Sequence, residues 1–190
     1  MYVPPAFAVD DRAWALRLIA EHPFGLLLTC DRDYPRASHI PMVARERDGD
    51  IWIHGHLARA NAQVDAIFGG HVATAVFQGP HAYVSPRWYE EPRRSVPTWN
   101  YVAVQACGRL READSHATLA RLVDAFERGD ERWALDEIDE EYYAKQLRGI
   151  VAFELRVTEL FAKAKLGQNR SAVDQARIAA ETGLSPSLGP

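Results

Sequence analysis

The sequence predicts a mainly β (α+β) protein whose antiparallel strands close into a barrel, with short helices on its flanks. The chain contains about six or seven runs of strand length, and turn residues separate them. Its helical segments are short and do not alternate regularly with the strands. Because parallel sheets need a crossover segment between successive strands, an antiparallel barrel fits the pattern better. Barrels bind ligands at their mouths and flanks.

The first elements are a helix and a group of strands. The acidic pair at 10–11 stands where a helix is capped, and the apolar stripe after it predicts a helix that ends near 22–23. FGLLLTC at 24–30 is a continuous apolar run, and turn-forming residues follow at 31–35 and again at 48–50. Two or three antiparallel strands are therefore expected in this part of the chain.

The segment IWIHGH at 51–56 alternates so that His54 and His56 leave the strand on the same face. A short helix over 59–68 and a buried strand over 71–79 are expected next. The remaining elements are expected in chain order: an exposed loop at 90–95, a strand at 101–110, an amphipathic helix at 115–128, a short acidic helix within 136–146, a long strand at 149–166, a helix from Ser171 and a loose end at 186–190.

The composition indicates an ordinary globular protein with no overall attraction to nucleic acid or anionic membrane. The chain has 22 basic and 26 acidic side chains and a formal net charge of −4. Cys30 and Cys107 lie in apolar runs, so we expect buried thiols in a cytoplasmic protein and no disulfide or zinc site. No basic leader is present and no window approaches about eighteen continuous apolar residues, so neither secretion nor a membrane span is expected.

Three segments are candidates for ligand binding, and the first is VPTWNY at 96–101. It places Trp99, Asn100 and Tyr101 at the mouth of a strand. A flat heterocycle with hydrogen-bonding edges needs an aromatic face and amide groups, so this combination indicates a ring-shaped ligand. An aromatic cluster that packs in the core is the alternative interpretation.

The second candidate is HGHLARAN at 54–61, where a strand is expected to end and a helix to begin. Backbone N–H groups at that helix start, together with Arg59 and Asn61, would hold a phosphate by charge and dipole. His54 and His56 could instead form a metal pair, but no carboxylate or thiol stands at accompanying ligand spacing, so no metal is assigned. One polar and one packed histidine is the remaining interpretation.

The third candidate is KAKLGQNR at 163–170, which directly follows the last long strand. Its lysines and arginine could bind phosphate, and its amides could bind ring carbonyl and ring N–H groups. Solvated positive charge at a strand end is the alternative. No glycine-rich phosphate loop of either common type is present, which excludes nucleotide-hydrolase and dinucleotide-fold interpretations.

Five segments, taken in chain order, together resemble the FMN-binding negative transcriptional regulator family of the PaiB type. These segments are MYVPPAF, HGHLARAN, GPHAYVSPRWY, VPTWNYVAVQACG and KLGQNRSAVD, and they extend from residue 1 to about residue 174. The resemblance implies an FMN-binding split barrel, similar to the pyridoxamine-phosphate oxidase and flavin reductase group, that forms a homodimer with the flavin at the subunit boundary. It implies such a domain over 1–170, with 171–190 as a C-terminal helix and tail.

The resemblance also implies cofactor-binding residues, whereas catalytic residues stay unassigned. One subunit would line the ring edge with Ser38, His39, Ile40 and Pro41, and would surround the phosphate and ribityl chain with His54, His56, Leu57, Ala58, Arg59 and Asn61. The second subunit would bring Trp99 and Asn100 to the ring and complete the pocket with Lys165, Gln168 and Arg170. The chain departs from the pattern at Ala60, where relatives tend to place a second basic residue, and at Gly167, where serine is usual.

Two functions follow from the resemblance: an FMN-binding transcriptional regulator, and an FMN-dependent oxidoreductase or flavin reductase acting on a small molecule. The enzyme would use the pocket above the ring, with candidate walls at His81, Tyr83, Trp88, Tyr89 and Tyr101. A third interpretation is that the site binds haem through one of the seven histidines.

DNA binding rests on the family resemblance alone. ARIAAETGLSPS looks like the start of a helix-turn-helix, but the prolines and glycine at 185–190 leave no place for a recognition helix. DNA contact would therefore need Arg87, Arg93 and Arg94 of both subunits to gather into one patch.

Overall fold

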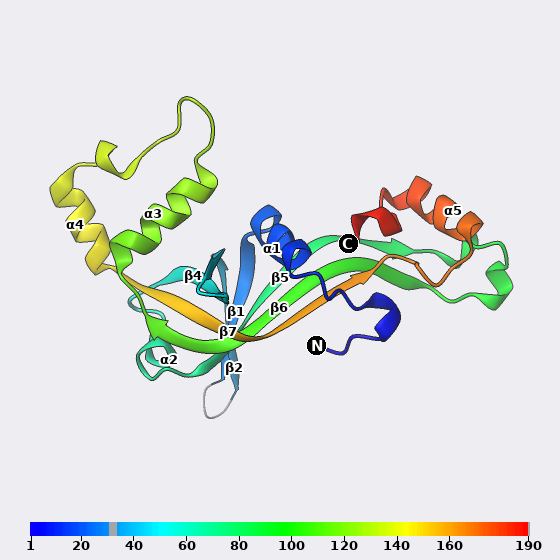
Figure 1. The fold of residues 1–190 in the computed structure, drawn as a ribbon, viewed down its shortest axis with the longest axis horizontal. Helices are drawn as coiled ribbons and strands as arrows, with labels where there is room; N and C mark the ends of the chain where they lie inside the picture. The colour runs from blue at the N-terminus through cyan, green and yellow to red at the C-terminus, as the bar shows by residue number, and fades with distance from the viewer. Residues whose placement is uncertain (31–33, 190) are drawn as a thin grey trace. The chain divides into compact units, whose positions relative to one another are not determined.

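A computed structural model describes residues 1–30 and 34–189 of the chain. Its helical elements are η1 (Pro5–Phe7), α1 (Arg12–Glu21), α2 (Val64–Phe68), η2 (Pro86–Trp88), η3 (Pro92–Arg94), α3 (Ser115–Phe126), η4 (Leu135–Glu137), α4 (Glu140–Arg148), α5 (Ala172–Thr182) and η5 (Pro186–Leu188), where η denotes a short 3-10 helix. Its strands are β1 (Phe24–Cys30), β2 (Pro35–Pro41), β3 (Val43–Arg47), β4 (Asp50–Ala58), β5 (Val72–Val84), β6 (Thr98–Glu112) and β7 (Ile150–Lys165) (Figure 1). The turn predicted at 31–35 lies partly outside the described residues.

The strands of the described residues form one sheet in the order β2-β1-β5-β6-β7-β4-β3. β1 pairs antiparallel with β2 and with β5, while β4 pairs antiparallel with β3 and with β7. β2 and β3 are therefore the two edges of the sheet. This antiparallel split-barrel sheet with short flanking helices confirms the fold class predicted from the sequence. Among the described residues, no helix is long and apolar enough to cross a membrane.

The chain divides into two compact units. Unit 1 comprises 1–22, 77–105 and 161–190, and unit 2 comprises 23–76 and 106–160. The long strands β5, β6 and β7 contribute residues to both units. Helices α1 and α5 belong to unit 1, whereas α2, α3 and α4 belong to unit 2. The boundary at residue 170 that the sequence suggests stays a prediction.

In unit 1, a glycine allows α1 to pack closely against the sheet. Asp11 caps α1 by accepting a hydrogen bond from the Trp14 backbone N–H at 3.0 Å. A Cβ at Gly79 would lie 2.6 Å from Val102 and 2.8 Å from Leu18, so a larger residue would force them apart. The strand predicted over 71–79 does not end at this glycine, because β5 continues through it to Val84.

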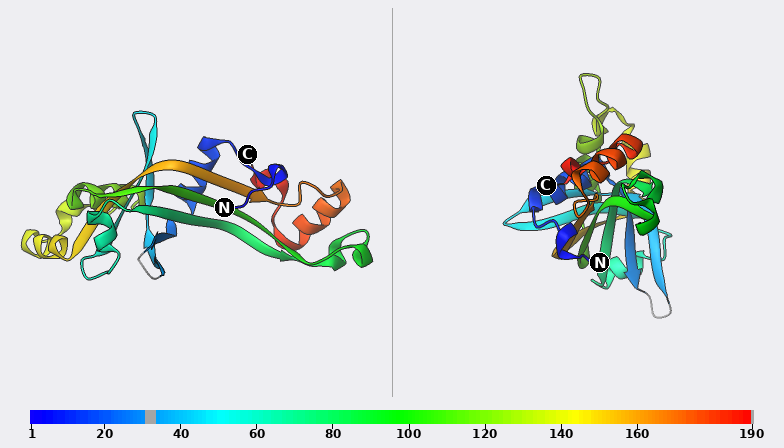
Figure 2. Two further views of the ribbon diagram at one scale, coloured as in Figure 1. Left: turned by 90° about the horizontal axis from the view of Figure 1, so that it is seen from below. Right: turned by 90° about the vertical axis from the view of Figure 1, so that its right-hand side faces the viewer.

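The C-terminal segment of unit 1 is held in place as far as residue 189. Leu184 is buried, and the Trp14 indole Nε1 donates a hydrogen bond to the Leu188 carbonyl oxygen at 3.0 Å. Helix α5 packs against η2 (Figures 1 and 2), and the cluster there contains Val84, Tyr89 and Ile178 with Trp88 beside it. The prediction of a loose end at 186–190 is therefore wrong for 186–189, because a buried indole supplies a hydrogen-bond donor to it.

In unit 2, close backbone approaches determine how the strands pack. A Cβ at Gly55 would lie 2.9 Å from the Phe153 ring and 3.2 Å from the Met42 side chain, and both of these side chains are fully buried. A Cβ at Gly108 would lie 1.9 Å from the Arg156 carbonyl oxygen, so β6 passes β7 at a distance that only glycine permits.

Two expectations for unit 2 are wrong. The helix predicted over 59–68 begins only at Val64, because β4 continues to Ala58 and a turn follows it. The thiols are not buried: Cys30 is exposed at the end of β1 and Cys107 is half-buried. An apolar run identifies a strand or helix but does not tell which side of it is covered.

Candidate functional site

The predicted cofactor residues separate cleanly between the two units. Unit 2 holds all those that the resemblance assigns to one subunit: Ser38, His39, Ile40, Pro41, His54, His56, Leu57, Ala58, Arg59 and Asn61. Unit 1 holds all those that it assigns to the second subunit: Trp99, Asn100, Lys165, Gln168 and Arg170. Each unit therefore holds one half of the predicted site.

The half-site of unit 2 is built on a hydrogen-bonded group of three polar side chains. Asn61 Nδ2 donates to Ser38 Oγ at 2.9 Å, and Ser38 Oγ donates to Gln63 Oε1. The Gln63 backbone N–H in turn donates to Asn61 Oδ1 at 2.9 Å. This closed network joins the turn after β4 to strand β2 and brings Ser38 and Asn61 into contact. Their role in cofactor binding stays a prediction.

Gln63, which sequence reasoning missed, anchors this network. Its side chain is only 2% exposed, and Nε2 donates to the Leu27 carbonyl oxygen at 3.1 Å and to Thr29 Oγ1 at 3.0 Å. A third, longer contact of 3.3 Å reaches the Arg36 carbonyl oxygen. The local sequence around Gln63 could not predict this role, because the hydrogen-bond partners of its side chain lie on strands that are distant in the sequence.

Arg59 is oriented by the segment that precedes and begins β7. Its guanidinium donates from Nε to the Arg148 carbonyl oxygen at 2.8 Å and from Nη2 to the Ile150 carbonyl oxygen at 3.0 Å. The Arg59 backbone N–H donates to the Gly149 carbonyl oxygen at 2.8 Å. Because the guanidinium carries five N–H donors, further donors remain for an anion at this exposed position.

The helix start that was predicted to support a phosphate beside Arg59 is not there. Asn61 lies in a turn, its backbone N–H donates to the Ala58 carbonyl oxygen at 2.8 Å, and α2 begins only at Val64. α2 is also too short, at five residues, to provide a helix dipole of use. Any phosphate contact in this half-site therefore depends on side-chain charge and on the turn, not on a helix end.

The two histidines of β4 are held in a neutral state by burial. His54 is 4% exposed, and desolvation, followed by the charge of Arg121, lowers its pKa to about 4 although Glu154 opposes the shift. Desolvation also lowers the pKa of His56. Among the described residues no group of three His, Cys, Asp or Glu side chains is placed to hold a metal ion.

The remaining predicted residues of unit 2 differ in their access to a ligand. His39 is exposed and stacks on Phe24, with ring centroids 6.2 Å apart. Leu57 is 2% exposed, so its side chain belongs to the core and only its backbone could reach a ligand. Ile40 and Pro41 are half-buried, and Ala58 is exposed.

The half-site of unit 1 presents an aromatic surface. Trp99 is 52% exposed, and the rings of His81 and Tyr83 lie 6.0 Å and 6.2 Å from it. Asn100, its neighbour, is buried, and its Nδ2 has no hydrogen-bond acceptor among the described residues. Of the other candidate walls, Trp88 and Tyr89 belong to the packed cluster under α5.

Positive charge gathers beside this surface. Lys165 Nζ donates to Thr98 Oγ1 and to the Trp99 carbonyl oxygen, each at 2.6 Å. Desolvation lowers the pKa of Lys165, and the charges of Lys163 and Arg170 lower it further. Arg170 lies 4.4 Å over the ring of Tyr89. An anionic or electron-rich ligand group would relieve the repulsion among these cations.

Gln168 has a structural role. Its Oε1 accepts from the Leu166 backbone N–H at 2.8 Å, and its Nε2 donates to the Ala164 carbonyl oxygen at 2.5 Å. The side chain therefore holds the loop after β7 together. Gly167 in this loop has φ of +84°, a conformation that disfavours the serine usual in the family, so the departure has a backbone explanation.

Comparisons with known proteins agree with this fold. A family model described as "Putative FMN-binding domain" matches residues 1–159. The chain is 33% identical to protease synthase and sporulation protein PAI 2 of Bacillus subtilis over 182 residues, which cover 94% of this chain and 87% of that protein. It is 28% identical to an uncharacterized protein of Aspergillus fumigatus, over 92% of this chain and 88% of that protein.

Two solved structures have a similar fold at low sequence identity. The flavocytochrome Anf3 of Azotobacter vinelandii superposes with a TM-score of 0.64 at 18% identity, over 89% of this chain and 74% of that chain. The FAD and heme binding protein of Mycobacterium smegmatis gives a TM-score of 0.62 at 19% identity, over 90% of this chain and 78% of that chain. These likenesses support the split-barrel architecture.

The anchoring role of Gln63 predicts the effect of an isosteric change. Gln63→Glu would turn a carboxylate oxygen toward the Leu27 and Arg36 carbonyl oxygens, so the free energy of unfolding should fall by about 3 kcal/mol at pH 7. Urea unfolding measures this, and part of the loss should be recovered near pH 4.5, where a protonated carboxyl can donate again. Gln146→Glu, at an exposed position on α4, is the control. Equal losses in both variants would contradict the anchoring role.

The burial of His54 predicts a pH dependence of stability. Its pKa is about 4 in the folded chain against 6.5 for a free imidazole, so the unfolded chain binds the proton more tightly. The stability contributed by neutral His54 is complete above pH 6.5 and is lost as the pH falls to about 4, by up to about 3 kcal/mol. Compared with the unmodified protein, His54→Gln should show a flatter decline of unfolding free energy over this range. The exposed His71→Gln should follow the unmodified protein, and identical slopes in all three would refute the prediction.

Proposed function

Because the chain belongs to the FMN-binding domain family whose model it matches over residues 1–159, we propose that it binds FMN as a homodimer, with the flavin at the subunit interface. The observation that carries the proposal is the pre-oriented guanidinium of Arg59 beside the polar turn at 59–63. FMN, when bound, supplies reversible one- and two-electron chemistry at its ring. The residues of this chain bind and orient it.

Unit 2 supplies the groups for the phosphate and ribityl chain. Arg59 offers the guanidinium donors that its backbone contacts leave available, and these suit a phosphate geometrically. The Ser38–Asn61–Gln63 network holds hydroxyl and amide groups next to it in a fixed arrangement, of the kind that suits the hydroxyls of a ribityl chain. The pre-organisation lowers the entropy lost on binding.

Unit 1 supplies groups for the ring. The exposed Trp99 offers an aromatic face for the ring. Asn100 is 2% exposed and its Nδ2 is covered, so its side chain is not among the donors that a ligand can reach. Lys165 and Arg170 provide positive charge for the electron-rich edge of a flavin. The donors present therefore fit FMN.

A homodimer is supported by the apolar surface of both units. Trp99 and Tyr83 of unit 1 are 52% and 46% exposed, and Phe24 of unit 2 is 66% exposed. Trp99 and Tyr83 are in contact and form one aromatic surface, of the kind that meets a partner or a ligand. Because the resemblance divides the cofactor residues between subunits, dimer formation and flavin binding should be coupled.

For the biological role we favour regulation of transcription over catalysis. The similarity to PAI 2, a protein named for protease synthesis and sporulation, supports regulation.

Any DNA contact would have to come from Arg87, Arg93 and Arg94, which are exposed around η2 and η3. Helix α5 ends at Thr182, Gly183 after it has φ of +71°, and η5 follows. An FMN-dependent oxidoreductase is the second candidate function. The exposed rings of His81, Tyr83 and Trp99 could form the wall of a substrate pocket above the flavin.

The phosphate assignment predicts different affinities for FMN and riboflavin. Arg59→Ala should weaken FMN binding by about 1.5 to 3 kcal/mol, or roughly ten- to 150-fold in Kd, and should leave riboflavin binding nearly unchanged. Trp99→Ala should weaken both ligands, because it removes a ring contact. Flavin fluorescence titration measures the affinities, light scattering compares the mass with the 21.3 kDa chain, and Arg177→Ala on the exposed side of α5 is the control.

Three results would overturn this part of the proposal. FMN affinity that survives Arg59→Ala would mean that the phosphate lies elsewhere. A monomer that binds FMN fully, or a dimer that binds no flavin, would contradict a shared site. Thermal unfolding of each variant verifies that the fold is retained, which matters for Arg59 because it also contacts two backbone carbonyls.

The two roles predict different behaviour of the FMN-loaded protein. A regulator should retard promoter fragments at low salt, with retention that weakens as salt rises, and the triple variant Arg87→Ala, Arg93→Ala, Arg94→Ala should lose it. A triple variant on other exposed arginines, Arg45→Ala, Arg128→Ala and Arg177→Ala, is the control. No retardation across a promoter panel, together with rapid NAD(P)H-dependent bleaching of the flavin, would favour the oxidoreductase instead.

A further inference from the structure

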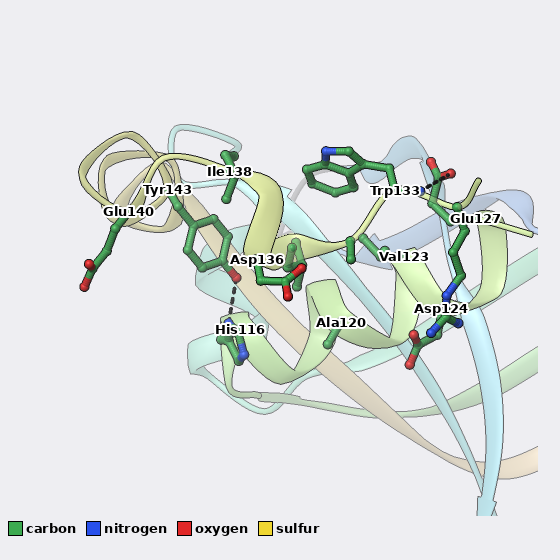
Figure 3. A pocket seen from close by; sticks show the side chains of 13 residues that line it. His116, Ala120, Val123, Asp124, Glu127, Trp133, Asp136, Ile138, Glu140 and Tyr143 are labelled. Carbon is green, nitrogen blue, oxygen red and sulfur yellow. Dashed lines mark hydrogen bonds between the residues drawn. The ribbon is translucent and has the colours of Figure 1, made fainter. Parts of the chain in front are cut away.

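Unit 2 contains a second concave site, formed by residues to which the flavin proposal gives no role. α3, the connection at 127–139 and α4 surround a cavity of about 530 Å³ (Figure 3). Small-molecule sites range from about 300 to 1,000 Å³, so this volume suits a ligand of moderate size. We define this feature as the helical cavity.

The two long walls of the helical cavity are apolar. α3 contributes Ala120 and Val123, which lie one turn apart, and Trp133 and Ile138 of the connection lie across from them (Figure 3). Trp133 is 38% exposed, so it is accessible to a ligand in the cavity. These four side chains would hold an apolar body.

Hydrogen bonds give the cavity a defined shape. At one end the Tyr143 hydroxyl and His116 Nδ1 are hydrogen-bonded at 2.8 Å, and their rings meet edge to face with centroids 5.8 Å apart. At the other end the Trp133 backbone N–H donates to Glu127 Oε2 at 3.4 Å, so the connection is tied to the C-terminal end of α3. Both contacts are drawn in Figure 3.

The charged groups around the cavity are predominantly acidic. Asp124, Glu127, Asp136 and Glu140 line it, and Arg132 is the one basic side chain that the described lining contains. The surrounding segment 130–141 carries seven acidic residues and one basic residue. The carboxylates of Asp124 and Asp136 accept no hydrogen bond and form no ion pair within the described residues. The local potential is therefore negative, and it favours a cation.

A second copy of this chain is a poorer occupant than a small cation. In an isologous contact the same acidic rim would face itself, and like charges would oppose each other across the interface. The formal net charge of −4 strengthens that repulsion. An anionic ligand would meet the same obstacle.

We propose that the helical cavity binds a small organic cation with an apolar body, such as a protonated aromatic amine. The body lies between Val123 and Trp133, and the acidic lining, which includes Asp124 and Asp136, attracts the ammonium group. The indole of Trp133 adds a cation–aromatic contact. This site is independent of the flavin, so its test can succeed or fail whether or not FMN binds.

The test compares three probes of one shape on the full-length protein. Isothermal titration calorimetry with 2-(1-naphthyl)ethylamine should show saturable binding, whereas the neutral 2-(1-naphthyl)ethanol should bind several-fold more weakly and 1-naphthaleneacetate should not bind. Titration at 50 mM and at 500 mM NaCl should show a salt dependence for the amine alone.

Matched variants locate the bound amine. The double variant Asp124→Asn, Asp136→Asn should weaken amine binding about three- to tenfold, because each exposed ion pair contributes modestly. Trp133→Ala should weaken the amine and the alcohol alike. The control Asp130→Asn, Glu131→Gln removes the same charge from exposed positions of the same segment that do not line the cavity, and it should change the Kd less than about twofold.

Four outcomes would overturn the proposal. The first is no saturable binding of the amine, the second is equal affinity for the amine and the alcohol, and the third is equal effects of the two double variants. The fourth is a change of oligomeric state in Trp133→Ala, which would show that a second copy covers the cavity. Circular dichroism of each variant and the flavin spectrum, recorded with and without amine, verify that the fold and the other site are unchanged.

Discussion

The polar half-site of unit 2 depends on one buried interaction, the set of hydrogen bonds made by the Gln63 amide. An amide is suited to this position because it donates to the Leu27 carbonyl and Thr29 hydroxyl while its oxygen accepts from Ser38. A carboxylate could only accept and an ammonium could only donate. The amide joins β1, β2 and the turn after β4, and through Asn61 it places the groups beside Arg59. The half-site is therefore pre-organised by a buried polar network.

The modest net charge of the chain conceals a separation of charge. Lys163, Lys165 and Arg170 gather at the end of β7 in unit 1, where desolvation, and then the charges of Lys163 and Arg170, lower the pKa of Lys165. The acidic residues gather in the segment 130–141 of unit 2, beside the helical cavity. Each region favours ligands of opposite charge, and a single value of −4 describes neither. Two different classes of ligand can thus be accommodated by one small chain.

Local chemistry explains which elements could be predicted from the sequence. Asp11, of the acidic pair predicted to cap the first helix, caps α1, and Asp114 and Ser171 cap α3 and α5 in the same way. Such a cap requires only a side-chain oxygen and an N–H three residues later. The helix predicted to begin at residue 59 does not form there, because the Asn61 side chain accepts from the Gln63 N–H and makes a turn first. Gln63 was missed, and Gln168 holds its own loop rather than presenting its amide.

The sequence by itself determined the antiparallel strands, the order of the family segments and the starts of the longer helices. These depend on periodicity and capping, which act over a few residues. Only the tertiary structure decided that Cys30 is exposed, that the C-terminal segment is held by Trp14, and that a cavity forms beside α3. Each of these follows from contacts between distant residues, and Trp14 and Leu188 are separated by 174 positions. No local pattern encodes such a contact, because it arises from the way in which the completed strands and helices pack.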